Sequence, residues 1–295
     1  MEVRFNHLRF LNANADYSSS PVVVLGCPFD GTSTYQPGSR FAPNAVREAS
    51  LAIESYSPEQ NKDLSCVNLC DLGDLELPFG NTSRVLDLIN LAIDQVLNER
   101  KVTITLGGEH LISLPVITAF KKHHPDLVVV HLDAHADLRE EYLGEKLSHS
   151  TVMRRVLEVT GDSNLIQIGI RSGTQEEFLL ARSIGCQYSI HHGNNNRNTT
   201  GDDLRKIERK IQGKPLYISL DLDVLDPSVL PGTGTPEPGG FTFAQLMQVL
   251  SILRAGNVVG MDIVELLPYQ TPHQVSSIVA AKIMRESILL YFSCP

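Results

Sequence analysis

The chain has 295 residues, 42% of them hydrophobic, and a formal net charge of −9. A mean hydropathy of −0.05 permits a substantial core, and α/β folds often use this length for one domain, so we expect a single domain over residues 1–295. The negative charge argues against nonspecific nucleic-acid binding and suits a cationic substrate. The sequence has no apolar signal-peptide core and no apolar run long enough to span a membrane, so we expect a cytoplasmic location without membrane partners.

Short apolar runs alternate with longer amphipathic segments along the chain. Runs rich in Val, Ile and Leu are typical of parallel strands buried on both faces. We expect strands at Val22–Gly26, Val67–Leu69, Val102–Leu106, Leu127–Leu132, Leu165–Ile170, Cys186–Ile190, Leu216–Leu222 and Val258–Val264. We expect helices at Arg84–Glu99 (with Ser83 as cap), Leu111–His123, Leu204–Ile211, Phe243–Ala255 and Ala281–Tyr291. This alternation predicts a parallel sheet that binds ligands beyond the carboxyl ends of its strands.

Polar motifs follow three of these apolar runs: LGGEH at Leu106–His110, DAHAD at Asp133–Asp137 and LDLD at Leu220–Asp223. Side chains at alternate positions of an extended chain project from one face. Six of them can therefore converge at neighbouring strand ends: His110, Asp133, His135, Asp137, Asp221 and Asp223. Four crowded carboxylates repel one another unless cations lie between them. Because oxygen ligands outnumber imidazoles, we predict a site for two divalent metal ions, with Mn²⁺ favoured over structural zinc.

The order of GGEH, DAHAD, SLDLDVLDP and DIVE resembles the ureohydrolases, the superfamily of arginases and agmatinases. The segments PGSRFAPNAVREAS and GTGTPEPGG extend the resemblance over most of the chain. It implies an arginase-like α/β/α sandwich of three layers with an eight-stranded, mainly parallel sheet. It also implies two Mn²⁺ per chain, one held by the residues His110, Asp133, Asp137 and Asp221 and the other by Asp133, His135, Asp221 and Asp223.

The chemistry of such a site follows from charge. A guanidinium is a poor electrophile because its positive charge is delocalised, so its hydrolysis needs a strong nucleophile. Two metal ions about 3.5–4 Å apart can bridge a water and lower its pKa from about 15.7 towards neutrality, which yields hydroxide. Attack on the guanidino carbon releases urea and an amine that must take up a proton. The resemblance implies that Glu265 anchors the guanidinium and that His149 transfers the proton.

The stretch DAHADLREEYLGEKLSHSTVMRR resembles the agmatinase branch. Arginases carry an asparagine that helps bind the α-carboxylate and α-amine of arginine where this chain has Arg139. We therefore expect hydrolysis of agmatine to putrescine and urea, a step in polyamine (putrescine and spermidine) synthesis, with Glu140 and Glu141 near the distal amine. Aminopropylagmatine, 4-guanidinobutyrate, guanidine and, less favoured, arginine stay open as substrates. A carboxylated substrate would need a cation such as Arg139 or Arg171 in the pocket.

Two other classes of protein stay open: an inactive metal-binding scaffold, and a mononuclear zinc deacylase of related fold. The oxygen-rich ligand set disfavours the deacylase.

Ureohydrolases commonly form trimers or hexamers, so the resemblance implies a homo-oligomer. Among the remaining residues, we expect His131 to be a hydrogen-bonded core residue, Asp226 to shape a turn, and Cys66 and Cys70 to be buried reduced thiols.

Overall fold

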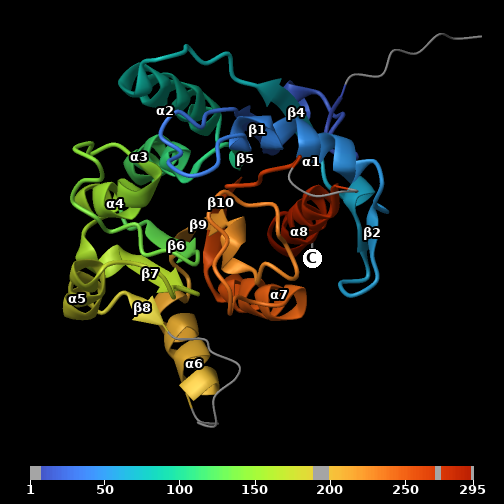
Figure 1. The fold of residues 1–295 in the computed structure, drawn as a ribbon. Helices are drawn as coiled ribbons and strands as arrows, with labels where there is room; N and C mark the ends of the chain where they lie inside the picture. Colours follow the sequence, from blue (N-terminus) through green and yellow to red (C-terminus); the bar gives the residue numbers. More distant parts are fainter. Residues whose placement is uncertain (1–7, 189–198, 270–273, 294–295) are drawn as a thin grey trace, which may run out of the picture.

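The computed structural model describes residues 8–188, 199–269 and 274–293 (Figure 1). One parallel sheet forms its centre, with the strand order β4-β1-β5-β10-β9-β6-β7-β8. In that order the strands span Leu69–Asp74, Val22–Cys27, Val102–Gly107, Asn257–Val264, Pro215–Asp221, Val128–Leu132, Leu165–Ile168 and Gln187–Tyr188. Seven of these strands have four residues or more, and the predicted count of eight holds only when the two-residue β8 is included. A separate hairpin pairs β2 (Tyr56–Ser57) with β3 (Lys62–Asp63).

Helices cover both faces of the sheet and complete a three-layer α/β/α sandwich (Figure 1). Residues of α1 (Ala42–Ser50), α6 (Thr199–Ile211), α7 (Phe243–Ile252) and α8 (Val275–Tyr291) belong to one apolar cluster. Residues of α2 (Thr82–Asn98), α3 (Ser113–His123), α4 (Val152–Thr160) and α5 (Gln175–Ile184) belong to the other. The sheet separates the clusters because alternate strand residues point to opposite faces.

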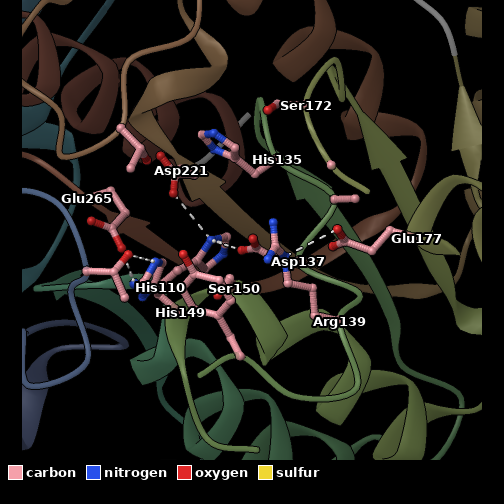
Figure 2. A pocket seen from close by; sticks show the side chains of 15 residues that line it. His110, His135, Asp137, Arg139, His149, Ser150, Ser172, Glu177, Asp221 and Glu265 are labelled. Carbon is pink, nitrogen blue, oxygen red and sulfur yellow. Dashed lines mark hydrogen bonds and ion pairs between the residues drawn. The ribbon is translucent and has the colours of Figure 1, made fainter. Parts of the chain in front are cut away.

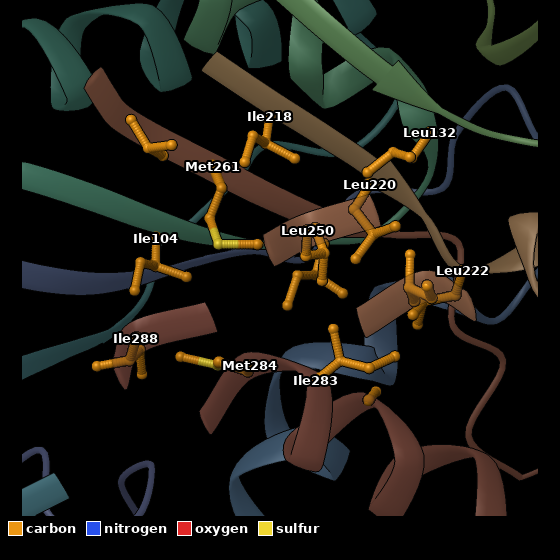
Figure 3. Packing of buried hydrophobic residues seen from close by; sticks show 14 of the residues in the cluster. Ile104, Leu132, Ile218, Leu220, Leu222, Leu250, Met261, Ile283, Met284 and Ile288 are labelled. Atoms are coloured by element: carbon orange, nitrogen blue, oxygen red, sulfur yellow. The ribbon is translucent and has the colours of Figure 1, made fainter. Parts of the chain in front are cut away.

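The packing of the first cluster is visible in Figure 3, where Ile218 and Leu220 of β9 lie on the same side as Leu250 of α7 and Ile283 of α8. All four side chains are fully buried. Because the central strands are buried on both faces, only their ends are free to present polar side chains. The predicted fold class is therefore confirmed, and it leaves the carboxyl edge of the sheet for function.

Several element boundaries differ from the predictions. Of the predicted strand Val67–Leu69, only Leu69 belongs to β4, because Val67 directly follows a 3₁₀ turn over Leu64–Cys66. Ser83 is not the cap of α2; the Asn81 side chain accepts the N–H of Arg84 at 3.0 Å instead. The last helix begins at Val275, six residues before the predicted start. Part of the predicted run Cys186–Ile190 lies outside the described residues.

The structure also contains three helices that the sequence patterns do not predict: α1, α4 and α5. Each has only nine or ten residues, fewer than three turns, so an apolar period has little room to repeat. Local signals still define their ends. Pro43 lies in the first turn of α1, and Thr174 and Glu177 form a capping box at the start of α5.

The four described cysteines are all free thiols. Cys27, Cys70 and Cys186 are buried, but Cys66 is exposed in the 3₁₀ turn, so the expectation that it is buried is wrong. No helix in the described part of the chain is long and apolar enough to cross a lipid bilayer.

Candidate functional site

The candidate site lies where four central strands, β5, β10, β9 and β6, end side by side. His110 follows β5, Glu265 follows β10 and DAHAD follows β6. Asp221 is the last residue of β9, and Asp223 follows that strand. These segments surround a cavity of about 270 Å³ at the carboxyl edge of the sheet. Its described lining includes Thr34, His110, His135, Asp137, Arg139, Tyr142, His149, Ser150, Ser172, Glu177, Asp221, Thr235 and Glu265 (Figure 2).

All six predicted metal ligands meet at the base of this cavity. The Nδ1 atom of His110 lies 3.1 Å from Asp133 Oδ2, 3.2 Å from Asp137 Oδ2 and 3.3 Å from Asp221 Oδ2. The Nδ1 atom of His135 lies 2.9 Å from Asp223 Oδ2 and 3.6 Å from Asp133 Oδ1. Asp133 therefore takes part in both groups, and its two carboxylate oxygens face different imidazoles.

The bonding state of these atoms fits a metal centre. Despite the short distances, His110 Nδ1 and Asp223 Oδ2 are buried without a hydrogen bond of acceptable geometry. Such unsatisfied atoms are costly in a protein interior, and a shared cation would satisfy both. The carboxylates also disturb one another: burial and the Asp133 charge raise the pKa of Asp137 to about 7. Burial lowers the pKa of His135, but the Asp223 and Asp133 carboxylates outweigh it and raise the pKa to about 12.

A buried hydrogen-bond chain fixes the tautomer of His110. Ser219 Oγ donates to Asp262 Oδ1 at 2.9 Å and lies 3.0 Å from His110 Nε2. Since the hydroxyl has one proton, which the carboxylate accepts, Ser219 must accept from His110 Nε2–H. In the neutral ring the lone pair of His110 therefore lies on Nδ1, the atom that faces the aspartates. Outer hydrogen bonds of this kind orient metal-binding histidines.

A second buried chain supports Asp133. Gln167 Nε2 donates to the Ala136 carbonyl at 2.7 Å and to His131 Nδ1 at 2.9 Å. His131 Nε2 lies 2.7 Å from Asp133 Oδ2. Because a carbonyl only accepts, the Gln167 amide orientation is fixed, and His131 must carry its proton on Nε2 and donate it to Asp133. His131 is fully buried, as predicted, and both its ring nitrogens are committed to protein partners.

Glu265 lies beside this cluster at the end of β10. Its backbone has a φ of 64°, and the other described non-glycine residue of the cluster with positive φ is Asp137, at 53°. Such conformations cost free energy and concentrate at functional sites. Glu265 Oε1 accepts the backbone N–H of His110 at 2.8 Å, which orients the carboxylate. Burial and the nearby Glu109 charge raise the pKa of Glu265 to about 8.

His149 also lines the cavity, at the start of a 3₁₀ turn that precedes α4 (Figure 2). Ser148 and Thr151 form a capping box around this turn. The His149 ring lies between two threonines, with Nδ1 2.9 Å from the Thr32 carbonyl and Nε2 3.3 Å from Thr34 Oγ1. Burial lowers the pKa of His149 to about 4. The imidazole is therefore neutral near physiological pH.

Two arginines near the cavity are already engaged by other groups. Arg139 stacks on the Tyr142 ring at 4.6 Å, and its Nε lies 3.5 Å from Glu177 Oε2. Arg171 donates to backbone carbonyls, including those of Asp223 and Glu237, each at 2.7 Å. Neither guanidinium is thus an unpaired cation for a substrate carboxylate.

Two expectations about acidic and turn residues have different outcomes. Glu140 forms ion pairs with Arg154 at 3.0 Å and Arg155 at 3.1 Å. Neither Glu140 nor Glu141 belongs to the described lining of the cavity, so the expectation that they lie near the distal amine is wrong. Asp226 accepts the N–H groups of Ser228 and Gly239 and shapes its turn, as predicted.

Five buried or half-buried residues support the site without having been predicted from the sequence: Thr32, Glu109, Gln167, Ser219 and Asp262. Ser219 lies two positions before Asp221 on the same strand face, so strand alternation could have found it. Glu109 and Asp262 lie inside the motifs GGEH and DIVE. Thr32 and Gln167 carry no local signal, because their partners are distant in sequence.

Comparisons with known proteins agree with this geometry. Residues 20–290 match the model of the arginase family. An agmatinase of Halalkalibacterium halodurans is 42% identical over 95% of each chain. A guanidinobutyrase of Pseudomonas aeruginosa is 30% identical over 95% of this chain and 89% of its own. The solved structure of an agmatine ureohydrolase of Thermoplasma volcanium covers 97% of this chain and 94% of its own, with 33% identity and a TM-score of 0.85. The chain belongs to the arginase family.

Proposed function

We propose that this protein is an agmatinase, which hydrolyses agmatine to putrescine and urea with the help of two Mn²⁺ ions. The observation that carries the proposal is the cluster of four aspartates and two histidines with unsatisfied buried atoms, beneath a cavity lined by His149 and Glu265. Similarity to proteins named agmatinase over nearly the whole chain supports the same activity.

The metal ligands in this proposal are the six clustered side chains: His110, Asp133, His135, Asp137, Asp221 and Asp223. Asp133 and Asp221 would bridge the ions. When bound, the ions supply a hydroxide nucleophile at neutral pH. Oxygen-rich ligation with two imidazoles suits Mn²⁺ better than a structural zinc, which commonly uses cysteine. The same argument disfavours a mononuclear zinc deacylase.

Glu265 binds the substrate guanidinium in this mechanism. One of its oxygens already accepts the His110 N–H, so the carboxylate is held in a single orientation before substrate arrives. A planar guanidinium can donate two parallel N–H bonds to a carboxylate, which positions its carbon for attack. His149 transfers a proton to the leaving amine, a role that its place on the cavity wall permits.

The charges at the distal part of the cavity favour agmatine over 4-guanidinobutyrate. The Arg139 charge is balanced by Glu177, and Arg171 is committed to backbone carbonyls. A substrate carboxylate at Arg139 would share that one cation with Glu177, which is 3% exposed, and the two negative charges would repel each other. The similarity to a guanidinobutyrase nevertheless makes 4-guanidinobutyrate the second candidate substrate.

The test is urea release by the Mn²⁺-loaded protein with agmatine, arginine, 4-guanidinobutyrate, aminopropylagmatine and guanidine. We expect the highest kcat/KM for agmatine. The metal-stripped protein is the control for adventitious hydrolysis. A higher kcat/KM for another guanidine would keep the metal chemistry and replace the substrate. No urea from any substrate, with two ions bound, would favour an inactive metal-binding scaffold and contradict the proposal.

We also propose that the protein folds as a single domain over residues 1–295 and acts as a trimer or hexamer. We propose a cytoplasmic location and a role in putrescine and spermidine synthesis. The family resemblance and the agmatinase relatives support them. Size-exclusion chromatography with light scattering would test the oligomer, and putrescine levels in a strain that lacks the protein would test the pathway.

A further inference from the structure

The buried carboxylate of Glu109 has no role in the metal cluster or in guanidinium binding. Glu109 is fully buried, and its two oxygens face the loop that follows β1. Oε1 accepts the hydroxyl of Thr32, while Oε2 accepts the Thr32 N–H at 2.9 Å and the Ser33 hydroxyl at 3.1 Å. Three hydrogen bonds therefore tie this loop to the GGEH motif.

Backbone contacts place the carboxylate under the loop. Gly108 N donates to the Cys27 carbonyl at 3.0 Å, and Glu109 N donates to the Phe29 carbonyl at 2.7 Å. A Cβ atom at Gly108 would lie 1.8 Å from the Phe29 carbonyl oxygen, which no side chain can tolerate. Glycine at this position thus permits the loop after β1 to pass directly over the end of β5.

The same loop holds His149 through both polar groups of Thr32. The Thr32 hydroxyl accepts the His149 backbone N–H at 3.1 Å, and the Thr32 carbonyl lies 2.9 Å from His149 Nδ1. The hydroxyl has one proton, which goes to Glu109, so its lone pairs are free for the His149 N–H. The carbonyl only accepts, so Nδ1 must carry the imidazole proton. The lone pair of the neutral ring is then on Nε2, beside the Thr34 hydroxyl.

We propose that Glu109 and Thr32 are positioning residues that hold His149 in the Nδ1–H tautomer, with the Nε2 lone pair available to the reaction. This inference rests on the proposed function. In this tautomer Nε2 can accept the proton that the attacking water loses and then give it to the leaving amine, whose nitrogen takes it up as the C–N bond breaks. The other tautomer has no lone pair on Nε2 and cannot accept that proton. Neither Glu109 nor Thr32 touches the substrate in this account; both act through His149.

Imidazole ¹⁵N NMR of the metal-free protein tests the tautomer without any activity measurement, and His149→Phe identifies the His149 signals. We expect a protonated Nδ1 and an unprotonated Nε2 in the wild type at neutral pH. Thr32→Val keeps the side-chain size but removes the hydroxyl, and Glu109→Gln removes the charge. Both variants should shift the His149 signals towards a tautomer mixture. A wild-type spectrum with the proton on Nε2 would overturn the inference.

Kinetics with Mn²⁺-loaded variants supply the second test. Glu109→Gln and Thr32→Val should lower kcat by about 10- to 100-fold, with the KM for agmatine and the Mn²⁺ content nearly unchanged. Ser33→Ala is the matched control, because it removes one hydrogen bond to Glu109 without a contact to His149. Its effect on kcat should be less than about threefold.

A double-mutant cycle decides whether Glu109 acts through His149. In the His149→Phe background, Glu109→Gln should have almost no further effect on kcat. Equal losses in both backgrounds would mean that Glu109 acts through the neighbouring His110 or through the fold, and would overturn the inference. If Glu109→Gln does not fold, a cycle of Thr32→Val with His149→Phe tests whether the loop acts through His149. If the wild type does not cleave agmatine, the proposed function fails, while NMR still decides the tautomer.

Discussion

Two of the buried clusters of charged side chains in the described part of the chain are bonded very differently. Near the edge of the sheet, Arg47 of α1 donates Nε and Nη2 to the two oxygens of Asp71 at 2.8 and 3.0 Å, and Nη1 to Asp74. Backbone N–H groups of Phe10 and Gly73 also donate to Asp71. At the centre, four aspartates face two imidazoles, and His110 Nδ1 and Asp223 Oδ2 lack hydrogen bonds.

This difference shows that burial of charge does not by itself mark a functional site. Arg47 is 1% exposed, yet its cluster contains its own cation and its polar atoms are largely paired, which is the pattern of a structural ion pair. The central cluster keeps two buried ligand atoms without hydrogen bonds, and it lies at strand ends that open into a cavity. Unsatisfied ligand atoms at a strand end are therefore the more specific sign of a bound cation.

The largest expected effect follows from removal of a carboxylate in the central cluster. Asp221→Ala should lose bound Mn²⁺, and urea release should fall by more than about 1,000-fold, because the hydroxide supply depends on both ions. Metal analysis of the purified variant and an agmatine assay measure the two effects. Two ions per chain in Asp221→Ala would contradict the bridging role of this residue.

Substitution in the edge cluster should separate stability from metal binding. Arg47→Met leaves the buried carboxylate of Asp71 and the half-buried carboxylate of Asp74 without their cation, and it should lower the free energy of unfolding by about 3–5 kcal/mol. The folded protein should still bind two Mn²⁺ and keep kcat/KM for agmatine within a few fold. Chemical denaturation measures the free energy of unfolding, and metal analysis measures the bound Mn²⁺. Loss of Mn²⁺ from the folded Arg47→Met protein would show that the two clusters are not independent.

His149 lies in the cavity wall but not in the charge cluster, so its substitution separates proton transfer from metal binding. His149→Phe should retain two Mn²⁺ and lower kcat by about 100- to 10,000-fold, the range of a proton-transfer group. The measurement is a steady-state assay beside metal analysis. A kcat equal to that of the wild type would remove His149 from the mechanism.

The smallest effect concerns Glu265 and the pH dependence of stability in the metal-free protein. Its pKa is raised from 4.5 to about 8 by burial and by Glu109, so between these values the folded state holds a proton that the unfolded state has lost. Stability should therefore fall as pH rises through this window, by up to about 1.4 kcal/mol per pH unit from this group. Glu265→Gln should flatten that fall in denaturation curves at pH 5.5, 6.5 and 7.5. Parallel curves for wild type and variant would argue against the raised pKa.

The convergence of the central cluster could be predicted from the sequence because its pattern is local. Asp133, His135 and Asp137 alternate directly after an apolar run, and Asp221 and Asp223 repeat that arrangement, so strand geometry alone places them on one face. The parallel sheet then brings the strand ends together.

The supporting bonds could not be predicted in this way. Glu109 binds Thr32 across 77 positions, and Gln167 binds His131 across 36. Such pairs exist only once the strand order is known. Arg47 lies in helix α1, which the sequence patterns do not predict, so its pairing with Asp71 could not be predicted either. The orientation of Arg139 depends on Glu177 of α5, another short helix that periodicity did not indicate.

We expect the four clustered aspartates and two histidines to hold two catalytic metal ions. The most direct test is a titration of the metal-free protein with Mn²⁺, in which bound metal and urea release from agmatine are measured at each ratio. The account predicts tight binding of two ions per chain, with activity that reaches its maximum as the second ion binds. Full activity with one ion or without metal would contradict it.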